Sequence, residues 1–518
     1  MSDDITVFLA VLPLLLMIVM ILKLKMPIHL ATLTTLILVV GICAFWLHTP
    51  VWTIGASVLY GALKGIWPIT IVIFMAIYSY NLMVANARMD ILRGFLSGLS
   101  NDRRIVSLII IWCFGTFLEG AAGFGTSVAI PISIMMALGF NPMRAAVAAL
   151  VADTLSTTFG AVGIPISILA STVGLSETGI SSTLMMQLGV FDLLLPFAVI
   201  YILEGSVTAF YGVALAAFVC GLATLAAQWI VASYVGPQLV DFAGALAGLI
   251  TLIVASKFTI NRVPYLYQIR KDSAREDEIA KPKRMAVLEA GAIYILSFVF
   301  ILLCSPLFPS IRAAALAIGS SVPFTLNDGR VLTFVIDWVA TPGMLIFFAT
   351  IAGGLLQKTP PAVFINTFLS TTQQLRASMI AISSIVAMAT LMDTSGLLNI
   401  VAQPLIANAG DFYLFISPLI GALGTFVTGS VTNANVLFGK LQLTAATELH
   451  LDTTFIVAAN AAGATAKMIS PQSISIALSA ASMPGRDAEL LGSTLRWFFF
   501  YMLLVEAMIA TVYFFLFA

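Results

Sequence analysis

Residues 115–126 read GTFLEGAAGFGT and place four glycines and one glutamate inside a long apolar segment. Residues 424–435 read GTFVTGSVTNAN and open with the same three letters, followed by a second cluster of glycine and polar residues. Irregular backbone is tolerated at membrane depth only where it is buried in protein or lines a cavity. The two stretches therefore predict broken helices at a site inside a membrane protein.

The composition indicates a membrane location for the chain as a whole. Of its 518 residues, 60% are hydrophobic and 9% are charged, whereas a soluble domain has roughly 25% charged residues. Apolar runs of about 20 residues, the length that crosses a bilayer, recur from end to end. We expect an all-α polytopic membrane protein with about 12 transmembrane helices, and a net charge of zero gives no reason to expect a nucleic-acid partner. The predicted crossings are 5–22, 28–47, 66–86, 145–174, 184–203, 207–229, 237–257, 286–304, 343–357, 376–398, 453–482 and 498–517.

Two segments do not fit this series of crossings. Residues 105–139 and 412–447 are each too short for two crossings, and each is broken near its middle by glycine and polar residues. We interpret each segment as a re-entrant hairpin, in which two half-helices meet near the centre of the membrane. A kinked helix packed against a partner is the alternative interpretation.

The distribution of positive charge predicts how these segments are oriented. Basic residues concentrate in cytoplasmic loops, and here they occur at 23–25, at 88–104 and in the charged linker 257–285. An extracytoplasmic N-terminus puts all three groups in the cytoplasm, provided that hairpin 105–139 returns to the side from which it came. Hairpin 412–447 has acidic flanks and is expected to open from the exterior, and the C-terminus is also predicted to be extracytoplasmic.

These orientations predict an inverted repeat, an arrangement in which secondary transporters place the substrate near the middle of the membrane. Residues 1–256 form the first transmembrane half, 257–285 a cytoplasmic linker and 286–518 the second half. Each half has three crossings, then a hairpin, then a broken helix. The match between GTFLEG at 115–120 and GTFVTG at 424–429 supports this repeat.

The hairpin tips and the broken helices 152–165 and 460–473 carry the groups that would hold a substrate. A helix N-terminus inside the membrane offers unpaired N–H groups and a partial positive charge, which favour an anion. Glycine lets the backbone approach a ligand closely. The candidate substrate-binding residues of the hairpins are Gly120, Gly123, Gly125, Thr126, Ser430, Thr432, Asn433 and Asn435. Those of the second broken helix are Lys467, Ser470 and Gln472.

Ionisable residues inside membrane segments are costly and are therefore functional candidates. Glu119, Asp153 and Lys467 are the main ones, and Lys440 lies nearer the exterior, where a long side chain can reach the interface. Lys467 suits a substrate carboxylate, or else it pairs structurally with Glu119 or Asp153. The sequence leaves both interpretations open.

The positions of the histidines limit which side chains could carry a coupling proton. The three histidines fall in loops or at helix ends: His29, His48 and His450. A proton would therefore be carried by a carboxyl group, whose protonated form is favoured by burial, and Glu119 and Asp153 are the candidates. If sodium drives transport, hydroxyls and carbonyls at 153–158 and 430–435 would be its ligands. The sequence permits both ions.

The sequence lacks the motifs that are typical of several other classes of protein. There is no GxxxxGK[ST] phosphate loop for an ATP-driven pump and no HExxH zinc motif. The four cysteines are scattered through apolar runs without a metal or disulfide pattern, so we expect no cofactor and no metal. An anion channel is conceivable, but two oppositely oriented hairpins suit alternating access better than a pore.

The same residues resemble those of the lactate permease family. The family carries a stretch close to EGAAGFGTPVA, then LGFNP and FGA-GIPI, and this sequence has EGAAGFGTSVA at 119–129, LGFNP at 138–142 and FGAVGIPI at 159–166. The family's second block is similar to GSDTSSNALFG-LQ and GKMISPQSI, and here GSVTNANVLFGKLQ occupies 429–442 and AKMISPQSI occupies 466–474.

The resemblance implies a plasma-membrane symporter that takes up L-lactate, D-lactate or glycolate together with a proton. A sodium-coupled carboxylate transporter of similar plan is the alternative, and an anion channel is a more distant one. By position, the resemblance marks Glu119, Gly120, Gly123, Gly125, Asn460, Lys467, Ser470, Pro471, Gln472 and Ser473.

The sequence departs from the family pattern at two informative positions. Val431 stands where the family has an aspartate in the second hairpin, and Asp153 stands where the family has an asparagine in the first broken helix. One carboxylate is lost and another is gained. Our hypothesis is that Asp153 takes over part of the missing carboxylate's role in coupling.

Overall fold

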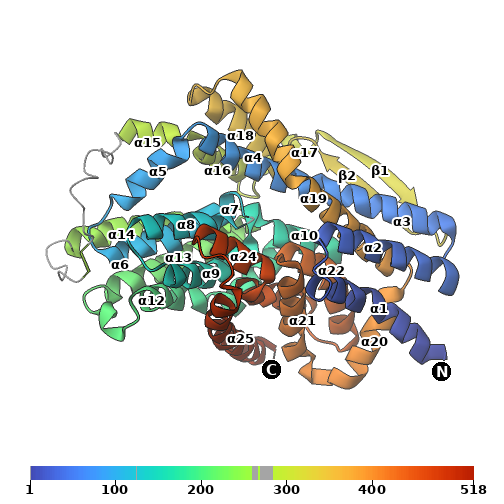
Figure 1. Ribbon diagram of the computed structural model, residues 1–518. Coiled ribbons are helices and arrows are strands. Elements are labelled where there is room, and N and C mark those ends of the chain that lie inside the picture. Colours follow the sequence, from blue (N-terminus) through green and yellow to red (C-terminus); the bar gives the residue numbers. More distant parts are fainter. Residues whose placement is uncertain (1, 124, 260–266, 269–283, 518) are drawn as a thin grey trace.

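The computed structural model describes residues 2–123, 125–259, 267–268 and 284–517 (Figure 1). Within these ranges the chain is helical except for one two-stranded antiparallel β-hairpin. Eight of the described helices are long and apolar enough to cross a membrane, or up to ten if each of two bent helix pairs is one crossing. The all-α polytopic class is therefore confirmed, and the candidate crossings among the described residues number eight to ten, against about twelve predicted. Most of the predicted linker 257–285 lies outside the described residues.

The elements of the first half run from blue to green in Figure 1. In chain order they are α1 (Ser2–Leu22), α2 (Ile28–Gly41), α3 (Val51–Lys64), α4 (Ile71–Ala85), α5 (Arg88–Ser97), α6 (Arg103–Ser107), α7 (Gly115–Ala121), α8 (Thr126–Ala137), α9 (Pro142–Phe159), α10 (Ile164–Val173), α11 (Glu177–Leu188), α12 (Val190–Glu204), α13 (Ala214–Tyr234) and α14 (Val240–Thr259).

The elements of the second half run from yellow-green to red. In chain order they are α15 (Arg284–Ala290), α16 (Ala292–Leu303), α17 (Pro309–Leu316), β1 (Gly319–Thr325), β2 (Val331–Asp337), α18 (Pro342–Leu356), α19 (Pro361–Thr394), α20 (Leu397–Ala409), α21 (Tyr413–Thr428), α22 (Val431–Glu448), α23 (Thr453–Ala462), α24 (Pro471–Ala480) and α25 (Asp487–Phe517).

Two features depart from the predicted plan. Helix α3 precedes the predicted third crossing and continues into α4 through a π-helical turn, with a kink at Trp67. Strands β1 and β2 form a hairpin between the predicted crossings 286–304 and 343–357, where the sequence analysis predicted no element, and Gly329 has the positive φ (85°) that its tight turn needs. The Trp52 side chain of α3 donates a hydrogen bond to the Thr325 carbonyl (2.8 Å), so the β-hairpin packs on the start of α3.

The two predicted halves are interleaved in space. The long helix α19 of the second half packs against α2, α3 and α4 of the first (Figure 1). Gly61 and Gly65 allow this approach, because a Cβ atom on either would lie 2.6 Å from a backbone Cα of α19. Helices α10 and α22, also from different halves, pack together in the centre.

The first hairpin consists of α6, a π-helical turn and α7 as one arm and α8 as the other. Both of its ends meet the same end of α12. Arg103, at the start of the first arm, forms an ion pair with Glu204 (2.9 Å). Arg144, just after the second arm, donates to the carbonyl of Leu203 (3.0 Å).

Arg104 fixes the base of the first hairpin more firmly still. Its guanidinium is 2% exposed and makes a bidentate contact with Asp102 at 3.0 and 2.6 Å. It also donates to the carbonyls of Ala209 and Tyr211 at 2.9 Å each, and it stacks on Tyr267 at 4.0 Å. A buried guanidinium is tolerated because these partners replace its hydration.

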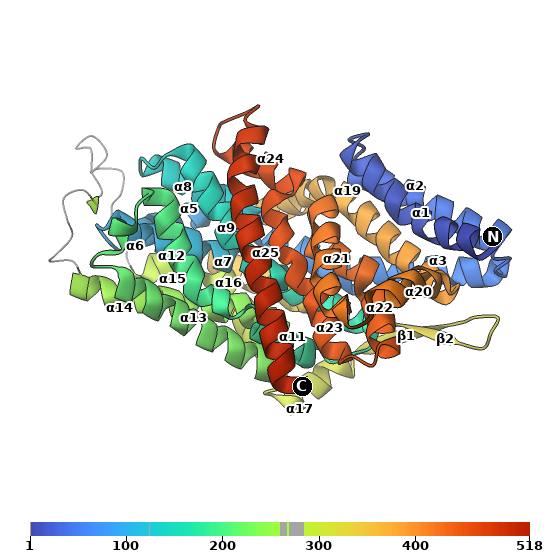
Figure 2. The same ribbon diagram turned by 90° about the horizontal axis from the view of Figure 1, so that it is seen from below.

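The second hairpin consists of α21 and α22, which turn at residues 429–430. Next to the hairpins lie the two broken helices, α9–α10 and α23–α24 (Figure 2). In the first, Gly163 has φ of +71° and touches the backbone of Pro237, which a Cβ atom would approach to 2.5 Å. In the second, a 3₁₀ segment, Gly463–Ile469, separates the two α-helical parts.

Candidate functional site

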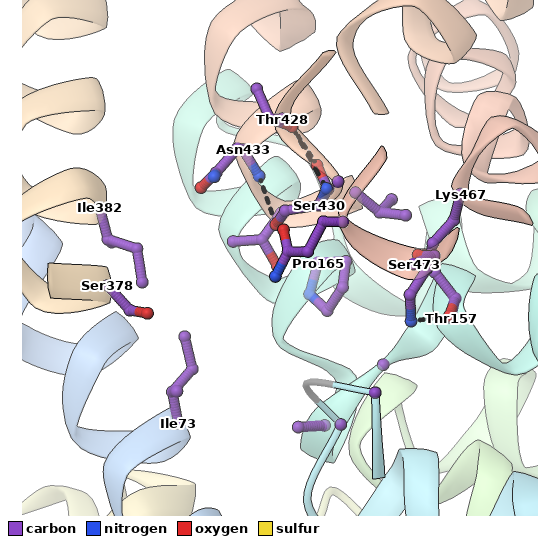
Figure 3. A pocket seen from close by; sticks show the side chains of 18 of the residues that line it. Ile73, Thr157, Pro165, Ser378, Ile382, Thr428, Ser430, Asn433, Lys467 and Ser473 are labelled. Carbon is purple, nitrogen blue, oxygen red and sulfur yellow. Dashed lines mark hydrogen bonds between the residues drawn. The ribbon is translucent and has the colours of Figure 1, made fainter. Parts of the chain in front are cut away.

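A cavity of about 290 Å³ lies where the hairpin tips meet the broken helices. Figure 3 shows Ile73 and Ser378 on one wall and Ser430 and Asn433 on the opposite wall. The first wall comes from α4 and α19, and the second from the turn and first residues of α22. His29, which the sequence placed away from the centre, borders the cavity at the start of α2.

Four helices begin at this cavity. They are α8, α10, α22 and α24, and the cavity is lined by residues at or near the first turn of each. Ser430 caps α22 by accepting from the N–H of Asn433 (3.3 Å), and Ser470 caps α24 by accepting from the N–H of Ser473 (3.2 Å). Because every helix N-terminus carries a partial positive charge, their convergence favours an anion in the cavity.

A three-residue ion cluster forms part of the same site. Lys467 Nζ lies 3.0 Å from Glu119 Oε1 and 2.9 Å from Asp153 Oδ2. The three side chains are 12%, 4% and 3% exposed, and Lys467 and Glu119 line the cavity directly. One ammonium group therefore faces two carboxylates, and the cluster carries a formal charge of −1 when all three are ionised.

Hydroxyl groups complete the cluster. Ser127 Oγ donates to Glu119 Oε2 (2.6 Å). Thr157 Oγ1 accepts from Lys467 and lies 3.2 Å from Glu119 Oε1 and 3.0 Å from Asp153 Oδ2. A single hydroxyl hydrogen can serve only one of the two carboxylates at a time. Asp153 Oδ1 has no hydrogen-bond partner within the described part of the chain, so this carboxyl keeps an unused position for a proton or another donor.

Two of the predicted substrate-binding asparagines form a structural network instead. Asn435 donates to the carbonyl of Pro165 (2.9 Å), and Asn460 donates to Asn435 Oδ1 (2.9 Å). Gln442 in turn donates to Asn460 Oδ1 (3.0 Å) and accepts from Tyr413 (2.8 Å). All four side chains are buried. The network links the second hairpin to both broken helices.

The predicted site residues thus divide into those at the cavity and those around it. The predicted residues that line the cavity are Glu119, Gly123, Gly125, Ser430, Thr432, Asn433, Lys467, Gln472 and Ser473. Those that do not line it are Gly120, Thr126, Asp153, Asn435, Asn460 and Ser470. Lining residues that the sequence did not single out include His29, Ile73, Thr157, Ser378, Thr428 and Ile476. Of these, only Thr157 carried a signal, as part of the hydroxyl run at 154–158.

The site shows no arrangement for a metal ion. Across the described ranges, no three His, Cys, Asp or Glu side chains gather as metal ligands would. The position between the two carboxylates is filled by the ammonium group of Lys467.

The chain matches a family model described as L-lactate permease over residues 6–517. The chain belongs to the L-lactate permease family. An L-lactate permease of Salmonella typhimurium is 32% identical over 511 residues, which cover 94% of this chain and 92% of the relative. An L-lactate permease of Streptococcus iniae is 36% identical over 401 residues, which cover 77% and 82%. The glycolate permease GlcA of Escherichia coli is 31% identical over 527 residues, which cover 94% and 92%.

Family membership confirms the resemblance that the hairpin and broken-helix motifs indicated, and it makes the chain a transporter rather than an enzyme. Among solved structures, the Alcanivorax borkumensis YdaH transporter aligns over 87% of this chain and 86% of its own, with a TM-score of 0.46 and 11% identity.

Proposed function

We propose that the chain takes up lactate or a closely related small 2-hydroxy monocarboxylate together with a proton. The observation that carries this proposal is the convergence of four helix N-termini and Lys467 on one cavity. This combination attracts a carboxylate without a bound metal. The cavity, about 290 Å³, is at the small end of ligand pockets, which span about 300–1,000 Å³. Relatives named as lactate and glycolate permeases support the same class of substrate.

The hydroxyl groups at the cavity suit the second group of such a substrate. Ser430 and Ser473 lie opposite the apolar side chains of Ile73 and Ile382 (Figure 3), and Thr432 also lines the cavity. A 2-hydroxy acid presents a carboxylate and a hydroxyl on one side and a methyl group or hydrogen on the other. The polar wall would bind the first two groups, and the apolar wall would contact the third.

The charge of the ion cluster favours a proton as the coupling ion. With Lys467 between Glu119 and Asp153, binding of one proton brings the formal charge of the cluster from −1 to zero. A neutral cluster is cheaper to carry through a low-dielectric environment than a charged one. Lys467 also occupies the space between the carboxylates that a sodium ion would need, which weighs against the sodium-coupled alternative.

The same cluster links proton binding to substrate binding. The substrate carboxylate and the cluster carboxylates compete for Lys467, because its ammonium has only three hydrogens to donate. A proton on Glu119 or Asp153 weakens the hold of that carboxyl on Lys467 and leaves the ammonium available to the substrate. Binding of the proton and binding of the anion therefore favour each other.

We infer that both hairpins are re-entrant and belong to an inverted repeat with extracytoplasmic termini. The contacts of Arg103 and Arg144 with neighbouring residues at one end of α12 support a first hairpin that returns to its own side. Cysteine labelling from either side of the membrane tests this arrangement. Residues 103 and 144 should react from the cytoplasm, and residues 411 and 450 from the exterior. Labelling of 103 and 144 from opposite sides would contradict it.

Transport measurements in proteoliposomes test the function. A pH gradient, acid outside, should drive labelled lactate above its equilibrium level, and glycolate should compete. A sodium gradient at equal pH should not drive accumulation. If sodium alone drives it, the sodium-coupled alternative is correct, and if neither gradient concentrates lactate, the protein acts as a channel or on another substrate.

A further inference from the structure

Two buried carboxyl groups play no part in the site described above. Asp241, in the first turn of α14, is 2% exposed, and Asp192, in the first turn of α12, is 0% exposed. None of their four oxygen atoms has a hydrogen-bond partner among the residues that the structure describes. An ionised carboxylate without a partner is too costly to bury. Burial without a partner therefore favours the protonated form of both groups.

Asp241 lies directly behind the ion cluster. A Cβ atom on Gly120 would lie 2.8 Å from the Cβ of Asp241, so only glycine lets α14 approach the residue that follows Glu119. Glu119 lines the cavity, whereas Asp241 does not. Glu119 thus lines the cavity, while the next residue of α7 packs against Asp241.

The ionisable surroundings of Asp241 come from several helices. Those within electrostatic range are Glu119 on α7, Asp153 on α9, Asp192 on α12 and Lys467 before α24. Further from Asp241 are the thiols of Cys113 and Cys220 beside Gly248, the hydroxyl of Tyr294 across Phe117, and Tyr501, which is near Asp192. Among the described residues, the cation in range is Lys467, which is already paired with two carboxylates.

A second buried polar group without a partner among the described residues packs on α14 one turn after Asp241. Gln228 is 1% exposed and packs on Gly244, one turn after Asp241 in α14, where a Cβ atom would lie 2.6 Å from its Cγ. Its Oε1 accepts no hydrogen bond from the described residues. A neutral carboxyl has a hydrogen to donate to such an acceptor, and a carboxylate has none.

The segment just before Asp241 forms polar contacts with α10 and α11. Gln238, one turn before Asp241, donates to Glu177 Oε2 (2.8 Å) and Ser167 Oγ (3.1 Å). Glu177 is partly exposed at the start of α11. Figure 2 shows α11 near the bottom, whereas the turn between α1 and α2, which borders the cavity, is at the top. These contacts therefore tie the N-terminal end of α14 to α11.

We propose that Asp241 is a second proton-holding carboxyl of the transport cycle, which exchanges its proton with the Glu119–Asp153 pair. This inference rests on the proposed proton coupling. In the step, the Asp241 O–H bond breaks and an O–H bond forms on Glu119 or Asp153. The ion cluster changes from −1 to zero while Asp241 changes from zero to −1, so total charge is conserved. Asp241 then regains a proton from water.

Asp241→Asn in proteoliposomes tests the proposal through two measurements on one preparation. Asparagine imitates a carboxyl that never releases its proton. Exchange of labelled for unlabelled lactate needs no proton release and should stay within about threefold of the unmodified protein, whereas accumulation driven by a pH gradient should fall at least about tenfold. Glu448→Gln, an exposed carboxyl bonded to Gln403, is the matched control and should change neither rate.

Two results would overturn the proposal. Accumulation by Asp241→Asn at the level of the unmodified protein would show that no proton passes through this group. Loss of exchange together with accumulation would make Asp241 a structural or binding residue instead. If the unmodified protein itself fails to accumulate lactate under a pH gradient, the proton-coupled function is wrong, and that failure is recognised before any variant is compared.

Discussion

Replacing Lys467 by methionine isolates the energetic role of the ion cluster. The change keeps a long side chain but leaves Glu119 and Asp153, at 4% and 3% exposure, without the ammonium group that lies 3.0 and 2.9 Å away. Removing one partner of a buried ion pair costs about 3–5 kcal/mol. We expect a loss of about 4 kcal/mol in the free energy of unfolding at pH 8. The loss should shrink toward low pH by at most about 1.4 kcal/mol per pH unit for each carboxylate that takes up a proton.

Denaturant-induced unfolding in detergent micelles measures this loss. Lys440→Met is the control, because Lys440 lies 3.8 Å from Asp393 with both side chains at least 32% exposed, and such a pair is worth less than about 1 kcal/mol. The triple variant, which adds Glu119→Gln and Asp153→Asn to the methionine, removes every charge and should recover most of the stability. The reasoning is wrong if Lys467→Met stays within about 1 kcal/mol of the unmodified protein, or if the triple variant is no more stable than the single one.

Three further predictions use transport in proteoliposomes or denaturation in detergent micelles. Asp153→Asn makes the ion cluster neutral without a bound proton, so a pH gradient should no longer drive lactate accumulation; unchanged coupling would remove the hypothesis that this carboxyl replaces the one missing from the second hairpin. Gly163→Ala should unfold the protein or cost more than about 3 kcal/mol, since its Cβ would lie 2.5 Å from backbone, whereas Gly139→Ala, at a similar positive φ in open space, should cost only about 1–2 kcal/mol in the same denaturation assay. Asn435→Ala removes the acceptor of the buried Asn460 amide and a donor to the Pro165 carbonyl, and it should cost about 1–3 kcal/mol, while the exposed Asn408→Ala should stay within about 0.5 kcal/mol; equal losses for the two asparagines would show that the buried network does not stabilise the fold.

The sequence was informative wherever polar groups interrupted apolar runs. Glycine and ionisable residues are rare and costly at membrane depth, so their positions predicted both hairpins and all three members of the ion cluster. The wall formed by α4 and α19 gave no such signal. Ile73 and Ile382 are apolar whether they face lipid, another helix or a cavity, and a membrane helix therefore shows little amphipathic pattern to separate these sides.

The geometry of the α-helix explains why one of two predicted asparagines lines the cavity and the other does not. Asn433 and Asn435 are both polar and only two residues apart, but each residue turns the helix by about 100°. Asn433 faces the cavity, whereas Asn435 points to α10 and Asn460. Asp241 was missed for a different reason. An acidic residue in the first turn of a helix is ordinarily favourable, so nothing in the sequence indicated that this one lies behind Gly120.

The hydrogen bonds of Arg104 also constrain the order in which the nascent chain can assemble. Two of its acceptors, the carbonyls of Ala209 and Tyr211, lie 105 and 107 residues downstream. At about 5–20 residues per second, a ribosome needs roughly 5–20 s to make that stretch. During this interval the guanidinium must stay hydrated at the bilayer surface, since Asp102 alone cannot replace its water. The first hairpin therefore docks late, after helices α9 to α12 have been made.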